Sequence, residues 1–193
     1  MNWLVQEGLP NRTLLDLGCG AGSFTMEALK NGASSCIGID LSPGMIRTAN
    51  GLAREMGFEG RSKFELGNAA ISDLPRSDIV VLDKVICCYP EADALLKNAT
   101  SASQGMVGFV VPRDEGLWKW PLRLGAKIEN FIDKLRKRGP AGFYIHPLRT
   151  IDTALTAAGF VRQRKSASWV WLVFLYARPD ERSLQPTQSL AGH

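Results

Sequence analysis

The sequence lacks long hydrophobic runs and has few of the residues that build metal sites. None of its apolar stretches approaches the ~20 residues that a membrane-spanning helix needs. The first twelve residues, MNWLVQEGLPNR, have no basic start followed by an apolar segment, so we expect no secretory signal and a cytoplasmic protein. With two histidines and no CxxC spacing, neither a zinc site nor any other metal requirement is predicted.

The four cysteines fall inside or beside apolar runs that we expect to be buried strands: Cys19, Cys36, Cys87 and Cys88. Free cysteine packs as a small hydrophobic side chain. We therefore predict reduced core residues rather than disulfides or metal ligands.

The length and charge distribution point to one domain with one basic segment. A chain of 193 residues with 45% hydrophobic content can bury one sizeable core and is short for two. We expect a single domain over 1–179 and a disordered polar tail over 180–193. Residues 113–138 hold eight basic and four acidic residues, a balance equal to the whole chain's net charge of +4.

The most informative stretch is TLLDLGCGAGSFTMEALKNGASSCIGID, residues 13–40. Its apolar start predicts a buried strand that breaks into Gly18, Gly20 and Gly22. A helix-period pattern follows until Asn31-Gly32, which is typical of a helix C-terminus, and a second apolar run ends in Asp40. This order of strand, glycine loop, helix, strand and acid predicts a unit that holds a nucleoside.

The glycine spacing indicates which nucleoside. Glycines let the backbone N–H groups approach a ligand closely, and an acid at the second strand's end can accept hydrogen bonds from ribose hydroxyls. A dinucleotide fingerprint needs its third glycine where Ser23 stands, so an oxidoreductase is disfavoured. Asp16 suits a ligand with an ammonium group, which S-adenosylmethionine carries.

DLGCGAG at 16–22, with Asp40 closing the next strand, resembles the cofactor signature of class I S-adenosylmethionine-dependent methyltransferases. The segments VVLDKVICCYP and VPR, with Tyr144 and His146, are similar to a group of small bacterial methyltransferases, and more distantly to magnesium-protoporphyrin O-methyltransferases. The resemblance covers about residues 11–178. It implies an α/β, Rossmann-like, seven-stranded sheet of order 3-2-1-4-5-7-6, with strand 7 antiparallel and helices on both faces.

The resemblance also implies the cofactor contacts. The methionine moiety is expected at Asp16 and the glycine loop, the ribose at Asp40, and the adenine between Leu41-Met45 and Asn68-Ala69. Asn68 stands where the family usually has an acid that accepts from the adenine amino group, and its carbonyl oxygen can still accept. A plain turn residue is the alternative. The full set of expected cofactor residues is Asp16, Gly18, Cys19, Gly20, Gly22, Asp40, Leu41, Met45, Asn68, Ala69 and Asp83.

Further elements complete the expected alternation. Helices are predicted over 43–56, 91–99 and 151–158, and parallel strands over 63–67, 78–84 and 105–111. The strand over 78–84 is apolar throughout, as a central parallel strand should be. At the end of the chain, 161–165 alternates with charge like an edge strand, whereas 169–177 is apolar on both faces and belongs inside the sheet.

The methyl acceptor is expected over the carboxyl edge of the sheet. Tyr89, Arg113 and His146 follow the fourth strand, the fifth strand and the insertion 113–146, and we predict that they converge there as catalytic residues. Imidazole titrates near neutrality and could take the acceptor's proton, while Arg113 could hold an anionic group. The alternative is that His146 caps a helix or satisfies a backbone carbonyl.

The predicted reaction is methyl transfer to an O or N of an unidentified small molecule. The chain lacks the Asn/Asp-Pro-Pro-aromatic run typical of nucleic-acid amino-methylating enzymes, so a nucleic-acid partner is not expected. The insertion is interpreted as a core cover helix, ahead of a membrane or substrate lid. A homodimer is considered, and a noncatalytic or RNA-associated binding module is the alternative function.

Overall fold

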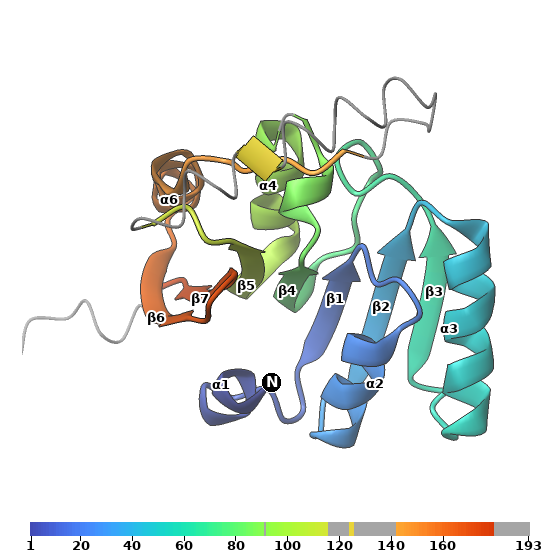
Figure 1. The fold of residues 1–193 in the computed structure, drawn as a ribbon. Coiled ribbons are helices and arrows are strands. Elements are labelled where there is room, and N and C mark those ends of the chain that lie inside the picture. Colours follow the sequence, from blue (N-terminus) through green and yellow to red (C-terminus); the bar gives the residue numbers. More distant parts are fainter. Residues whose placement is uncertain (91, 116–123, 126–141, 180–193) are drawn as a thin grey trace, which may run out of the picture.

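The computed structural model describes residues 1–90, 92–115, 124–125 and 142–179. Seven strands form one sheet in the order β3-β2-β1-β4-β5-β7-β6 (Figure 1). They are β1 Thr13–Leu17, β2 Ser35–Asp40, β3 Ser62–Leu66, β4 Ser77–Asp83, β5 Ser103–Pro112, β6 Val161–Ala167 and β7 Trp171–Ala177. Because β7 pairs antiparallel with both β5 and β6, while β1 to β5 pair in parallel, the predicted strand order and the direction of strand 7 are confirmed.

Helices cover both faces of the sheet, as predicted. They are α1 Asn2–Gln6, α2 Ser23–Lys30, α3 Pro43–Glu55, α4 Asp93–Ala102 and α6 Leu148–Ala157, with a 3-10 turn at Ile86–Cys88. Core residues of α1, α2 and α3 pack with one face of the strands, and those of α4 and α6 pack with the other. We call these the α2 face and the α4 face.

Strand β4 shows why the central strands are apolar throughout. Ile79 and Val81 pack on the α2 face, whereas Val80 and Leu82 pack on the α4 face. All four are almost fully buried. A parallel strand between two helical layers has no side that faces water, so alternation with polar residues is lost.

The final hairpin corrects one predicted boundary. Trp169 was expected inside the last strand, but its side chain is 83% exposed, and β7 begins at Trp171. Ser168 closes the turn, because its N–H donates to the carbonyl of Trp171 and its Oγ accepts from the N–H of Trp171. Strand β6 is exposed along its whole length, as expected for an edge strand.

Helix α4 begins two residues later than expected and continues to Ala102. Of the predicted insertion 113–146, most residues lie outside the part of the chain that the structure describes, as does the predicted tail 180–193. None of the helices in the described part is long and apolar enough to cross a membrane.

Candidate functional site

The loop after β1 uses its three glycines in different ways. Gly18, Gly20 and Gly22 all have left-handed φ values, +70°, +52° and +80°. A Cβ on Gly18 would lie 2.4 Å from Cγ2 of Val85, and one on Gly22 would lie 3.0 Å from the ring of Phe64. A Cβ on Gly20 would meet nothing within 4 Å. Gly18 and Gly22 therefore allow close packing, whereas the backbone at Gly20 has open space beside it.

Asp40 ties the glycine loop to the end of β2. Its Oδ2 accepts from the N–H of Gly20 at 2.9 Å, and its Oδ1 accepts from the N–H of Ser42 at 2.8 Å. Ser42 in turn caps α3, since its Oγ accepts from the N–H of Met45. The carboxylate is thus oriented by backbone groups on both sides.

Asp16 lies beneath this loop, where it is 1% exposed. Its Oδ2 accepts from the Thr25 hydroxyl at 2.8 Å. Burial, together with the nearby charges of Asp83 and Asp40, raises the pKa of Asp16 to about 7 against the lowering effect of the Thr25 hydrogen bond. Because the charges of Asp83 and Asp40 disfavour ionisation of Asp16, this region is suited to a positively charged ligand.

A pocket of about 200 Å³ opens at the carboxyl ends of β1, β2 and β4. Six predicted site residues line it: Gly18, Asp40, Leu41, Ala69, Asp83 and Tyr89. Leu41 and Met45 are 60% and 46% exposed at the start of α3. Cys19, Gly20 and Gly22 belong to the adjoining loop. The structure therefore brings most of the predicted cofactor residues around one edge of the sheet, where parallel α/β sheets bind ligands.

Asn68 is more heavily engaged than expected. Its Oδ1 accepts from the N–H of Ala70 at 3.0 Å and from the hydroxyl of Tyr89 at 3.0 Å. An adenine amino group that donated to this oxygen would have to replace one of these donors. Donation from Asn68 Nδ2 to a ring nitrogen is the contact that leaves them in place.

Sequence reasoning missed Asn98 and Gly38. From α4, Nδ2 of Asn98 donates to the carbonyls of Ala69 and Ser72, both at 2.8 Å, and so fastens the loop that walls the pocket. In β2, a Cβ on Gly38 would lie 2.6 Å from Phe64 and 2.8 Å from Sγ of Cys19. A glycine within a strand signals a close approach, whereas an asparagine within a helix carries no such signal.

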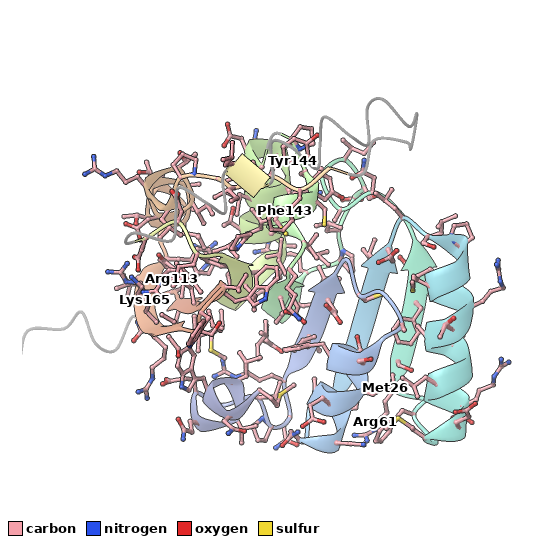
Figure 2. All side chains as sticks on the ribbon, viewed as in Figure 1. Met26, Arg61, Arg113, Phe143, Tyr144 and Lys165 are labelled. Atoms are coloured by element: carbon pink, nitrogen blue, oxygen red, sulfur yellow. The ribbon has the colours of Figure 1, made fainter. Side chains whose placement is uncertain are left out.

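Two of the three predicted acceptor residues meet. Nε2 of His146 donates to the carbonyl of Tyr89 at 2.9 Å, and the N–H of Tyr144 donates to the carbonyl of Cys87 at 2.8 Å. Arg113 lies elsewhere, toward β6 at the same end of the sheet as Lys165, whereas Tyr144 lies toward α4 (Figure 2). Nη1 of Arg113 donates to the carbonyl of Ser168 at 3.2 Å.

The adjacent cysteines correct another expectation. Cys87 is buried, but Cys88 is exposed and lines the pocket. Both thiols donate to the carbonyl of Lys84, a residue with φ of +61°. The neighbouring thiol of Cys87 lowers the pKa of Cys88. Three of the four cysteines are buried as predicted, and Cys88 is not because the 3-10 turn directs it away from the core.

Comparison with known proteins decides the family. Residues 9–115, more than half of the chain, match the family model described as a methyltransferase domain. The chain belongs to the class I S-adenosylmethionine-dependent methyltransferase family. The predicted family and its cofactor are thus confirmed.

Curated relatives of this methyltransferase domain include ribosomal protein L11 methyltransferases. That of Edwardsiella ictaluri is 34% identical over 106 residues, which are 50% of this chain and 36% of the relative. That of Pasteurella multocida is 36% identical over 81 residues, or 42% and 27% of the two chains. The alignments thus span about a third of each relative's length.

Solved structures share the fold. The magnesium protoporphyrin IX methyltransferase from Synechocystis PCC 6803 with bound SAH has a TM-score of 0.72 at 23% identity, covering 92% of this chain and 79% of that one. An O-methyltransferase family protein from Burkholderia thailandensis has a TM-score of 0.74 at 16% identity, covering 92% and 54%. The predicted resemblance to magnesium-protoporphyrin methyltransferases is therefore one of fold.

Proposed function

We propose that this chain transfers a methyl group from S-adenosylmethionine to an oxygen or nitrogen of a small molecule. The observation that carries the proposal is the convergence of Gly18, Asp40 and Asp83, from the ends of β1, β2 and β4, on one pocket. Open space beside Gly20 and the surrounding carboxylates fit a ligand with a ribose and two positive charges.

Each part of the site has a distinct task. When bound, S-adenosylmethionine supplies an activated methyl carbon on a sulfonium. Asp40 holds the ribose hydroxyls, and its bonds to Gly20 and Ser42 keep it in place. Asp16 and Asp83 provide the negative field for the ammonium and sulfonium charges. Because the donor is already activated, these residues act mainly by positioning and by excluding water.

The hydrogen bond of His146 favours a role in positioning Tyr89 over a role in proton transfer. Its Nε2 holds the carbonyl of Tyr89, whose hydroxyl holds Asn68 beside the adenine side of the pocket. Catalysis would have to use Nδ1. If His146→Ala lowers kcat for methyl transfer and changes its pH profile, the imidazole is a base; a rise in KM for the cofactor alone indicates positioning.

A protein amino group is the second candidate acceptor. It is favoured by the names of the curated relatives, which match about half of this chain. Incubation with radiolabelled S-adenosylmethionine and a cell extract, separated into macromolecular and small-molecule fractions, distinguishes the two. Label confined to protein would contradict our proposal.

Cofactor binding itself is tested by calorimetry with S-adenosylhomocysteine and with NAD. We expect binding of the first and none of the second, with a matching rise in melting temperature only for the first. Binding of NAD alone would favour an oxidoreductase and sink the proposal.

A further inference from the structure

A second, larger cavity of about 370 Å³ lies on the α2 face of the sheet, over β4, β5 and β7. Its floor includes Gly108 and Val110 of β5 and Val173 of β7, and its sides include Trp3 of α1 and Phe24 of α2. None of the residues predicted to hold the acceptor, Tyr89, Arg113 and His146, lines it.

Among the described residues, the helices cover this face of the sheet unevenly. Helices α2 and α3 lie over β1 to β3, and α1, which has five residues, is the short helix on the β5–β7 side (Figure 1). Gly108 contributes no side chain to the gap. A Cβ on Gly108 would lie 3.8 Å from Leu175 and from Val81, which is ordinary van der Waals contact. Close packing therefore does not require a glycine at this position.

The described wall of the cavity is largely apolar, and its polar side chains are those of Asn2, Asp83 and Ser166. Trp3, Phe24, Val110 and Val173 present apolar surface. Among the described residues that line the cavity, Asp83 is the single acidic or basic side chain. Asp83 also lines the pocket beside Asp40, so the two spaces meet at this carboxylate.

We propose that this cavity binds the methyl acceptor, and that the acceptor is a largely apolar small molecule with one hydroxyl or amino group donating to Asp83. This inference rests on the proposed function and adds the acceptor's location and chemical class. An anionic acceptor is disfavoured at this carboxylate, because it would place its charge beside that of Asp83.

The transfer step is balanced without another reactant. The acceptor's oxygen or nitrogen lone pair attacks the methyl carbon, the carbon–sulfur bond breaks, and its electron pair stays on sulfur, giving the neutral thioether. Asp83 accepts the hydrogen bond of the attacking group and takes its proton as the new bond forms. The carboxylate thus serves the acceptor from one side and the cofactor's positive charge from the other.

Three probes with the same ring system test the cavity: 2-naphthol, 2-methoxynaphthalene and 2-naphthoate. Each is titrated by calorimetry into the full chain saturated with S-adenosylhomocysteine at pH 7.5. We expect 2-naphthol to bind best, the methoxy compound about three- to tenfold more weakly because it cannot donate, and the carboxylate at least about tenfold more weakly. In Asp83→Asn, the difference in affinity between 2-naphthol and 2-naphthoate should be smaller than in the unchanged chain.

Gly108→Leu fills the cavity floor, and Gly51→Leu in α3 is its matched control, since a Cβ at Gly51 meets nothing within 4 Å. Gly108→Leu should abolish binding of 2-naphthol while S-adenosylhomocysteine still binds, and Gly51→Leu should change neither. The proposal is overturned if 2-naphthol fails to bind, binds Gly108→Leu equally well, or competes with S-adenosylhomocysteine. Because cofactor affinity is measured in the same samples, its loss would instead count against the proposed function.

Discussion

The pocket beside Asp40 and the cavity over Gly108 both include Asp83 in their walls, and they are built in different ways. In the pocket, hydrogen bonds from two backbone N–H groups orient Asp40. The cavity is bounded by five separate elements of the chain, α1, α2, β4, β5 and β7, with β6 at its edge. The difference teaches that the cofactor side needs fixed geometry, whereas the proposed acceptor side needs mainly volume and a hydrogen-bonding group.

The largest expected effect is the loss of folding stability on substituting Gly18, which has both a left-handed φ and no room for a Cβ. Gly18→Ala adds a Cβ that overlaps Val85 and forces a left-handed φ on a non-glycine residue. Together these should lower the free energy of unfolding by about 2–6 kcal/mol. Chemical denaturation measures the loss. The double variant Gly18→Ala/Val85→Ala should recover only the part due to overlap, and full recovery would show that φ does not matter.

Asp40→Ala should affect the pocket for the cofactor and leave the cavity over Gly108 unchanged. Losing a charge-assisted ribose contact should weaken S-adenosylhomocysteine binding by roughly ten- to a hundredfold, or about 1.5–3 kcal/mol. Calorimetry measures this, with the exposed Asp73→Ala as the matched control. Full affinity in Asp40→Ala would contradict the ribose assignment.

Asn98→Ala tests whether the wall of the pocket depends on α4. Two hydrogen bonds to carbonyls of the 69–72 loop are lost, so the free energy of unfolding should fall by about 1–3 kcal/mol and cofactor affinity about three- to tenfold. Asn50→Ala is the control, because Asn50 donates only to a carbonyl within its own exposed helix. Equal effects of the two variants on affinity would remove Asn98 from the site.

The smallest expected effect is on pH dependence, which should belong to the cofactor side alone. With the pKa of Asp16 near 7 in the free protein, the ammonium group of the ligand favours the ionised carboxylate, and binding below pH 7 must release a proton. Affinity for S-adenosylhomocysteine should therefore rise severalfold from pH 6 to pH 8 and then level off.

Calorimetry in buffers of different ionisation enthalpy counts the released proton. Asp16→Asn should flatten the profile. An affinity that falls as the pH rises would contradict the role given to Asp16. Folding stability without ligand should run the other way, because a carboxyl with a raised pKa contributes less as the pH rises from about 4 through 7.

Most of the cofactor side could be predicted because its determinants are local. The strand, the glycines with left-handed φ and the acid of the next strand lie within 28 residues, and each residue type answers a demand of its own backbone. The charged pattern of β6 likewise predicted an edge strand, and the apolar pattern of β7 predicted an interior strand. The apolar pattern does not show where β7 begins, so the prediction placed Trp169 in the strand. In the structure Trp169 lies in the turn, where the Ser168 hydroxyl accepts from the N–H of Trp171.

The amino-acid sequence by itself therefore determined the sheet and the place of Asp40 at the end of β2, since these rest on near-neighbour sterics and side-chain periodicity, and the resemblance of DLGCGAG indicated the family. Only the tertiary structure decided that Arg113 lies apart from Tyr89 and His146, and that Asn98 fastens the pocket wall. The cavity over Gly108 also emerged only there, because a space between elements depends on how the described helices and strands pack together. That property belongs to the packed layers and to no single segment.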